Sequence, residues 1–262
     1  MKKLLLSLMA LLLALQAKAQ YEEPPYYFKG MLNGKIEVEI AFEIGPHGIT
    51  AGYIYYPKAK TPAPILIVGS YMPDDDPYNM VYLREFQADG TVTGILQLRY
   101  SEVEGDYEFV SGQWTNPKTG AELPMSRMRS MFRKPDWYAV SPLTPEDPSR
   151  IGREYSYTFW NPNYKAMMGG AASFRAAGKN KLAFSISNCP QNIAEGDSEK
   201  GRPAVLSGNE FEYLNVNECN YGFRASFFPR FVVLETIAGG EKMHGCFGLG
   251  ASFDGVYIKV KN

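Results

Sequence analysis

The chain has 262 residues, with 27 basic and 28 acidic side chains and a formal net charge of −1. This balance leaves no basic field for nucleic acid or for an anionic membrane surface, so we expect neither partner. Aromatic residues and glycines are abundant, with 18 Tyr, 15 Phe, 3 Trp and 25 Gly. Aromatic side chains suit half-buried pleated surfaces and glycines suit turns and bends, so the composition favours an all-β protein.

The first 19 residues have the pattern of a secretory signal peptide. Residues 1–3 are a basic start, residues 4–15 are an apolar run broken only by Ser7, and Ala17 and Ala19 offer small side chains for cleavage before Gln20. The apolar run is too short to span a bilayer, which argues against a retained membrane anchor. We therefore expect an exported mature chain with no transmembrane segment and no cofactor. Its expected location is the periplasm, the extracellular medium or the cell surface of a Gram-negative bacterium.

Residues 47–128 repeat a three-strand unit, with matching positions about forty residues apart, as in repeat architectures. The first copy opens HGITAGYIYY and the second opens DGTVTGILQL, with Gly52 and Gly94 at equivalent mid-strand positions. Each copy then reaches a second glycine, Gly69 or Gly112, after a short apolar run. A mid-strand glycine usually marks a bend, a bulge or a close approach, so we expect Gly52 and Gly94 to occupy equivalent bends.

The repeat belongs to an antiparallel meander that we predict over residues 20–133, with about eight strands. Eight strands are enough to close an up-and-down barrel around a filled core or one small ligand. Residues 36–44 alternate apolar and polar side chains, which places the apolar side chains on one face and the charges in water. The dipeptide Asn33-Gly34 favours a type I′ hairpin. Pro124 cannot donate a ladder hydrogen bond, so the last strand should be an edge or a seam.

Residues 134–150 contain four prolines and no periodic pattern, which is typical of a linker between modules. Trp137 and Tyr138 could pin this linker to one of them. Residues 151–262 predict a second antiparallel β module, either barrel-like or a sandwich. Within it, Cys189–Ser207 carries prolines and glycines and is expected to be an ordered loop, with a short helix there as the alternative.

Three cysteines in an exported chain imply one disulfide and one free thiol. Cys219 precedes a predicted strand and Cys246 leads into the last one, and these two strands should be neighbours if the last strand closes the module. We therefore predict a Cys219–Cys246 disulfide and leave Cys189 free. A bridge between Cys189 and Cys219 is the alternative. A nucleophilic cysteine would need a base, and only His47 and His244 exist, so a structural thiol is the favoured interpretation.

Other chemical signals are weak. Two histidines and three cysteines do not match a zinc site at any standard spacing, and the aspartates at 74–76 lack the alternation of a calcium loop. Acidic residues at 102, 104, 106 and 108 surround a predicted turn, where paired carboxylates could serve glycoside chemistry. No phosphate loop, dinucleotide fingerprint or nucleophile elbow is present. We therefore predict no catalytic residue and no metal site, and these absences argue against an enzyme.

Two segments resemble known families. The strand DGTVTGILQL, followed later by SGQWTNP, is similar to the strand pattern of avidin-like and lipocalin-like barrels. The ending CFGLGASFDGVYIKV looks like the closing segment of various exported bacterial proteins, some of which are similar to periplasmic lysozyme inhibitors, small β-barrels that plug an enzyme cleft with a loop. These resemblances imply a binding fold and transfer no functional residue.

The sequence therefore favours a non-enzymatic binding protein for a small ligand, a glycan or a protein. Candidate ligand contacts are the aromatic residues Tyr53, Tyr55, Trp114 and Trp137, although filling a β core is the simpler role for such side chains. The alternatives are an extracytoplasmic hydrolase with a site between the modules and a structural or adhesive cell-surface protein. An open calyx or an aromatic shelf would favour binding, and a cleft with two carboxylates would favour catalysis.

Overall fold

The computed structural model describes residues 25–73, 78–189, 194–198, 202–215, 221–238 and 252–260. The expected signal peptide and the aspartates at 74–76 lie outside these ranges, as do His244, Cys219 and Cys246, so the predicted disulfide stays a prediction. The described chain is all β, as its composition predicted, apart from the 3-10 turns η1 (Pro46–Gly48) and η2 (Pro148–Arg150).

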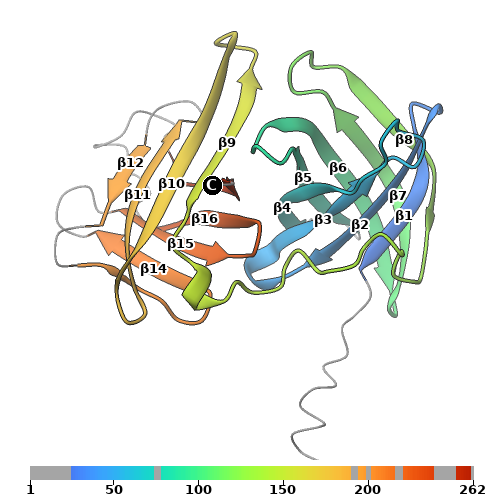
Figure 1. Ribbon diagram of the computed structural model, residues 1–262. Coiled ribbons are helices and arrows are strands. Elements are labelled where there is room, and N and C mark those ends of the chain that lie inside the picture. The colour runs from blue at the N-terminus through green and yellow to red at the C-terminus, as the bar shows by residue number, and fades with distance from the viewer. Residues whose placement is uncertain are drawn as a thin grey trace, which may run out of the picture.

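The first eight strands form a closed antiparallel barrel, here called the first barrel (Figure 1). Each strand pairs with the next in sequence, and β8 pairs with β1 to close the cylinder, which confirms the predicted meander. The strands are β1 (Tyr26–Leu32), β2 (Ile36–Ile44), β3 (Ile49–Tyr55), β4 (Ile65–Pro73), β5 (Asn79–Phe86), β6 (Val92–Val103), β7 (Asp106–Thr115) and β8 (Glu122–Ser130).

Two local predictions in the first barrel are confirmed. Asn33 and Gly34 join β1 to β2 with φ angles of 48° and 66°, the left-handed pair that a type I′ turn requires. Pro124 lies in β8, the strand that closes the barrel, so it occupies the seam. Its carbonyl oxygen accepts a hydrogen bond from Asn33 N at 2.8 Å, which joins the first hairpin to the closing strand.

The two repeated glycines lie on β3 and β6, the strands that open the two copies. Each lies two positions before a residue of the first-barrel core, Ile54 or Leu96, and therefore faces the barrel interior as well. A Cβ atom on Gly52 would lie 2.0 Å from the carbonyl oxygen of Ala41 on β2. A Cβ atom on Gly94 would lie 2.2 Å from Nε1 of Trp114 on β7. Close approach therefore explains both glycines, but Gly52 makes room for a neighbouring backbone and Gly94 for an indole ring.

The remaining strands form a second, nearly closed antiparallel sheet in the order β12-β11-β10-β9-β17-β16-β15-β14, with β13 paired to β11. The last strand of the chain therefore lies between β9, the first strand of this sheet in sequence, and β16, the second-last. The strands are β9 (Glu154–Asn161), β10 (Ala166–Gly178), β11 (Lys181–Cys189), β12 (Ala194–Asp197), β13 (Ala204–Val205), β14 (Glu210–Asn215), β15 (Tyr221–Phe227), β16 (Phe231–Ala238) and β17 (Gly255–Lys259).

Two expectations about the second sheet need correction. The described parts of Cys189–Ser207 are not simply loop or helix, because β12 and β13 both pair with β11 and so extend the ladder. The disulfide prediction assumed that the strand following Cys219 and the strand following Cys246 are neighbours in the sheet. Those strands, β15 and β17, each pair with β16 and not with each other.

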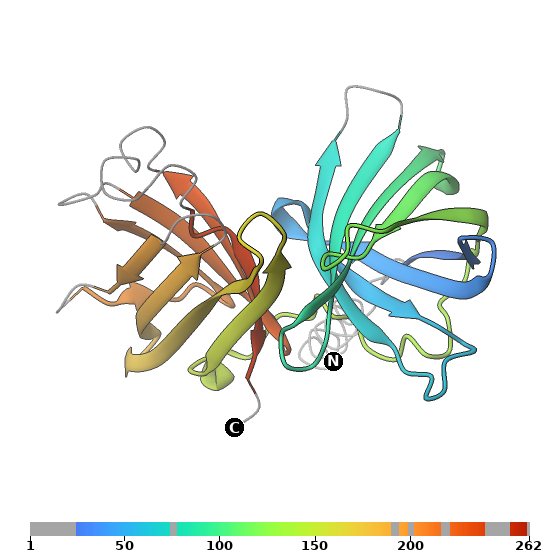
Figure 2. The ribbon, with the colours of Figure 1, turned by 90° about the horizontal axis from the view of Figure 1, so that it is seen from above.

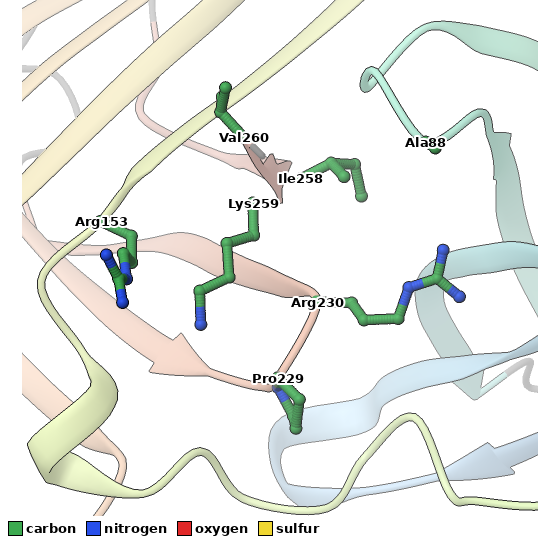
Figure 3. Close-up of a pocket in the computed structure, with 7 residues that line it drawn as sticks. All are labelled: Ala88, Arg153, Pro229, Arg230, Ile258, Lys259 and Val260. Carbon is green, nitrogen blue, oxygen red and sulfur yellow. The ribbon is translucent and has the colours of Figure 1, made fainter. Parts of the chain in front are cut away.

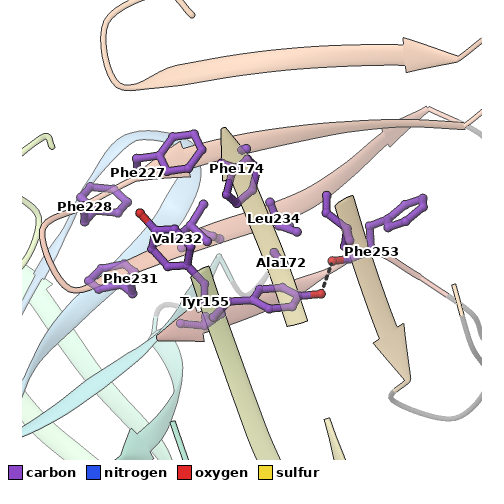
Figure 4. Packing of buried hydrophobic residues seen from close by; sticks show 14 of the residues in the cluster. Tyr155, Ala172, Phe174, Phe227, Phe228, Phe231, Val232, Leu234 and Phe253 are labelled. Carbon is purple, nitrogen blue, oxygen red and sulfur yellow. Dashed lines mark hydrogen bonds between the residues drawn. The ribbon is translucent and has the colours of Figure 1, made fainter. Parts of the chain in front are cut away.

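Aromatic side chains fill the interior of the second sheet (Figure 4). Phe174 from β10 packs edge-on against Phe227 from β15 with ring centroids 4.9 Å apart, and Tyr155 from β9 lies against both rings. This cluster continues into the first barrel, where outward-facing residues of β3 and β4 belong to it: Ile49, Ala51, Leu66 and Val68. The two bodies therefore share one apolar core where they lie side by side (Figure 2).

A backbone contact adds to this shared core. The turn between β5 and β6 reaches β9, where Thr158 N donates to Gly90 O at 3.1 Å and Thr91 forms a parallel bridge with Thr158. Gly90 has a φ of +86°, and a Cβ atom there would lie 2.5 Å from the carbonyl oxygen of Ser156. The docking of the first barrel on β9 therefore requires a glycine at this turn, for both its conformation and its size.

We expect Gly90→Ala to lower the free energy of unfolding by more than Gly105→Ala. Gly105 has nearly the same conformation, with a φ of +89°, but has no atom within 4 Å of a built Cβ. Both variants carry the left-handed penalty of about 1–2 kcal/mol, and Gly90→Ala adds a clash of about 1–3 kcal/mol. Urea-induced unfolding of the mature chain measures the difference. Equal losses in the two variants would show that the turn does not hold the barrels together.

Candidate functional site

A buried carboxylate lies at one end of the first barrel. Glu85, near the end of β5, is only 4% exposed and points inward like the core residues before it. Its Oε1 accepts a hydrogen bond from Thr93 Oγ1 at 2.7 Å. Its Oε2 accepts from Tyr56 OH at 2.9 Å and from Trp114 Nε1 at 3.2 Å. Glu85 on β5 therefore receives donors from three other parts of the barrel: the loop after β3, strand β6 and strand β7.

The hydrogen-bond donors around Glu85 are all neutral. Among the residues that the structure describes, no lysine or arginine forms an ion pair with this carboxylate. Burial, and then the negative charge and hydrogen bond of Glu85, raise the pKa of Tyr56, so this phenol stays a neutral donor. A carboxylate offers about four acceptor positions, and Glu85 uses three, so its singly bonded Oε1 can take one more donor.

A cavity of about 560 Å³ opens above this carboxylate, within the size range of small-molecule sites. We call it the barrel mouth. Its wall is mainly apolar and aromatic, and its rim carries an ion pair between Lys58 Nζ and Glu37 Oε1 at 2.6 Å. The residues that line it are Leu32, Lys35, Ile36, Glu37, Tyr56, Lys58, Ala59, Glu85, Thr93, Trp114 and Leu123.

Of the four candidate ligand contacts, only Trp114 lies in the barrel mouth. Sequence reasoning missed Glu85, Tyr56 and Thr93. A signal for Glu85 was present, because it shares the alternation of the inward-facing Leu83 on β5, and a charge at an inward position is unusual unless it is partnered. The partners could not be found in the sequence, since they come from three other segments of the chain.

The other three candidates lie on the outside of the first barrel, against the linker. Tyr55 stacks on Trp137 with ring centroids 5.3 Å apart, and Tyr53 packs edge-on against Tyr138 at 5.4 Å. Tyr53, Tyr55 and Trp137 are all half-buried. The structure therefore brings these three together as linker packing, away from Trp114, and their role as ligand contacts stays a prediction.

The linker between the sheets is clamped to two glutamates of β2. Trp137 Nε1 donates to Glu39 Oε2 at 2.6 Å, and Tyr138 OH donates to Glu43 Oε1 at 2.9 Å. Ser141 Oγ donates to the other oxygen of Glu43 at 2.5 Å. The expectation that the charges of β2 face water is wrong for these two, because the linker runs along the first barrel and covers them (Figure 1).

The clamp perturbs the ionisation of Glu39. Burial opposes ionisation, but hydrogen bonds from Tyr27, Trp137 and Lys29 outweigh it and lower the pKa of Glu39 from its ordinary 4.5. Burial and the hydrogen bond to Glu39 raise the pKa of Tyr27 to about 12. The carboxylate is therefore the form that the folded linker binds.

A second set of carboxylates lines a cleft of about 390 Å³ between the two bodies, where Glu235 on β16 and Asp254 before β17 face the outside of β4. Burial, with a contribution from the charge of Asp254, raises the pKa of Glu235, although Arg224 opposes the shift. Both oxygens of Asp254 already accept hydrogen bonds, one from Thr236 N and one from Ser252 Oγ at 2.7 Å. Glu235 is partnered too, because its Oε2 lies 3.6 Å from Nη1 of Arg224.

The remaining sequence candidates are scattered. His47 lies in η1 with its Nε2 3.7 Å from Glu210, and Cys189 is a half-buried free thiol at the end of β11. Glu104 has a left-handed φ of 55° in the β6–β7 hairpin, and Glu102 accepts a hydrogen bond from Tyr26 OH at 2.9 Å. In the described part of the chain, no group of His, Cys, Asp and Glu side chains could hold a metal ion.

Comparison of the chain with protein-family models, curated proteins and solved structures found no match. Among the described residues, no helix has the length and apolarity needed to cross a membrane.

We expect Glu39→Gln to lower the free energy of unfolding at neutral pH, because the linker then loses a charged acceptor. The folded-state pKa lies below the unfolded value, so this stabilisation is fully present above pH 4.5 and is lost as the pH falls through the folded-state pKa. The difference between wild type and variant should shrink in acid. Urea-induced unfolding at a series of pH values measures it, with Glu37→Gln on the same strand, where the side chain is 41% exposed against 14% for Glu39, as control. A difference that grows in acid would contradict the prediction.

Proposed function

We propose that this protein is an exported, non-enzymatic binding protein that takes a small sugar in the barrel mouth. The observation that carries the proposal is the cavity of about 560 Å³ over Glu85, a buried carboxylate with neutral donors and a remaining acceptor position. The basic, apolar and small-residue pattern of residues 1–19 supports export to the periplasm or the outside of the cell.

A sugar suits the chemistry of the barrel mouth better than a cation or a purely apolar ligand. The indole of Trp114 and the apolar wall match the apolar face of a sugar ring, and the carboxylate of Glu85 can accept a hydroxyl hydrogen bond. The lining holds as many lysines, Lys35 and Lys58, as glutamates, so its charge is balanced and suits a neutral ligand. Both lysines can donate to further hydroxyl oxygens. An apolar ligand would leave the remaining acceptor position of Glu85 unused.

The test is titration of the mature chain with neutral mono- and disaccharides, followed by calorimetry and tryptophan fluorescence. Saturable binding is expected, and Glu85→Gln should weaken it about 10- to 100-fold, the usual effect of a hydrogen bond to a charged group. Trp114→Ala should also weaken binding, whereas Trp160→Ala, on β9 of the second sheet, should not. Circular dichroism checks that each variant is folded.

Two results would overturn the proposal. One is the absence of binding to every sugar in the panel. The other is a sugar that binds wild type and Trp114→Ala with equal affinity, because this would place the site elsewhere on the molecule.

A second candidate function is an extracytoplasmic hydrolase with its site between the two bodies. The raised pKa of Glu235 and its position beside Asp254 in one cleft favour it, since an acid and an ionised carboxylate are the pair that glycoside hydrolysis uses. The engagement of both Asp254 oxygens argues against it. Sugar turnover by the mature chain that is abolished in Glu235→Gln would decide for the hydrolase.

A further inference from the structure

Polar side chains converge on one point in the barrel mouth, unlike those of the cavity at the junction of the two bodies (Figure 3). That cavity, of about 510 Å³, is lined in part by Arg153, Arg230 and Lys259. The Arg230 guanidinium points away from the other two and lies 6.0 Å from the ring centroid of Tyr53. Lys259 Nζ is already neutralised by a linker glutamate at 2.6 Å. In the barrel mouth, by contrast, three donors meet at the carboxylate of Glu85.

The part of the barrel mouth around Glu85, here called its base, offers a ligand an acceptor but no side-chain donor. Tyr56 and Thr93 each have one hydroxyl hydrogen and Trp114 has one indole hydrogen, and all three hydrogens go to Glu85. Among the described residues that line the cavity, the only other side-chain donors are two exposed lysines. The base therefore presents one open acceptor position, on Oε1 of Glu85.

The donors of the base are held in place by the surrounding strands. A Cβ atom on Gly94 would lie 2.2 Å from Nε1 of Trp114, so the indole packs directly against the backbone of β6. Thr93 Oγ1 accepts a hydrogen bond from Gln87 Nε2 at 3.2 Å and keeps its own hydrogen for Glu85. Turning any of these donors toward a ligand would remove a hydrogen bond from a buried carboxylate, which is costly.

The ligand group that suits this base donates one hydrogen bond and needs none in return. A hydroxyl brings one donor and two lone pairs, and the lone pairs would find no donor at the base. An ammonium brings three donors to a single open position and loses the hydration of a full charge. A secondary amide N–H brings one donor and no lone pair that needs a partner. The amide N–H is therefore the closest match.

The other atoms of an acetylated amide also have suitable surroundings in this cavity. In a trans amide the carbonyl oxygen lies opposite the N–H. With the N–H on Glu85, this oxygen faces away from the base, where the exposed Lys35 and Lys58 can donate. The acetyl methyl group can pack on the apolar wall, to which Leu32 and Leu123 belong.

We infer that the sugar of the barrel mouth is an N-acetylated amino sugar whose amide N–H donates to Oε1 of Glu85. This inference rests on the proposed function, because it names the class of sugar that the same site takes. Trp114 keeps its role as the surface for the apolar face of the sugar ring.

The test is calorimetric titration of the mature chain with three matched pairs of sugars. These are the gluco, galacto and manno forms, each with a 2-hydroxyl or a 2-acetamido group. The acetamido member of at least one pair is expected to bind about tenfold more tightly than its hydroxyl partner. The N-methylated form of that acetamido sugar lacks the amide hydrogen and should bind about tenfold more weakly than its parent. These comparisons use the wild-type protein, so they do not depend on the folding of a variant.

A variant then assigns the preference to Glu85. Glu85→Gln should remove most of the preference for the acetamido sugar, because it takes away the charged acceptor. Glu122→Gln should keep the preference, since Glu122 is an exposed carboxylate at the start of β8 and does not line the barrel mouth. Circular dichroism checks that both variants are folded.

The outcomes separate this inference from the proposed function. Equal affinities within all three pairs, with binding that Trp114→Ala weakens, would overturn the inference and leave the sugar site standing. Tighter binding of a free 2-amino sugar, or equal binding of the N-methylated form, would overturn it in the same way. Absence of binding to every sugar would overturn both. Equal or tighter binding of N-acetylalanine amide, which carries the amide without a sugar ring, would also overturn both, in favour of a peptide ligand.

Discussion

The apolar patch on the outside of β3 and β4 is the contact on which the arrangement of this molecule depends. Ile49, Ala51, Leu66 and Val68 would face solvent on an isolated barrel, but each is at most 2% exposed here because the second sheet covers them. Complete burial of an aliphatic side chain of this size contributes about 1.5–3 kcal/mol. The Gly90 turn on β9 adds a backbone hydrogen bond to this patch. The cleft between the bodies that Glu235 and Asp254 line exists only while this contact holds.

Buried or half-buried carboxylates lie where separate segments of the chain meet: the linker with each body, and the strand ends at the barrel mouth. Glu43 receives two linker hydroxyls, Glu85 receives three neutral donors at the barrel mouth, and Glu146 pairs with Lys259 across the linker and the second sheet. A carboxyl group is costly to bury without hydrogen-bond partners, so the donors to each of these three must be in place in the folded state. The buried amide of Asn188 follows the same rule in the second sheet, since it donates to the carbonyl oxygens of both Ser252 and Asp254.

The repeat illustrates how far a sequence pattern reaches. Equivalent glycines predicted equivalent strands, and Gly52 and Gly94 do lie on β3 and β6 with the same inward orientation. The pattern did not predict what each glycine makes room for. Beside Gly94 it is Trp114, whose indole then reaches Glu85, so one copy of the repeat helps to build the barrel mouth and the other does not.

Alternation, turn chemistry and the missing amide of proline were enough to predict the all-β class, the eight-strand meander, the Asn33–Gly34 hairpin and the seam at Pro124. The insertion of β17 between β9 and β16 and the core that the two bodies share became visible only in the folded molecule. The tertiary structure also decided which carboxylates are buried. The physical reason is that strand order, partners and burial depend on contacts between residues far apart in the chain, such as Glu39 with Trp137 and Thr158 with Gly90. The local alternation of apolar and polar residues is the same whether or not a distant segment covers a given side chain in the folded molecule.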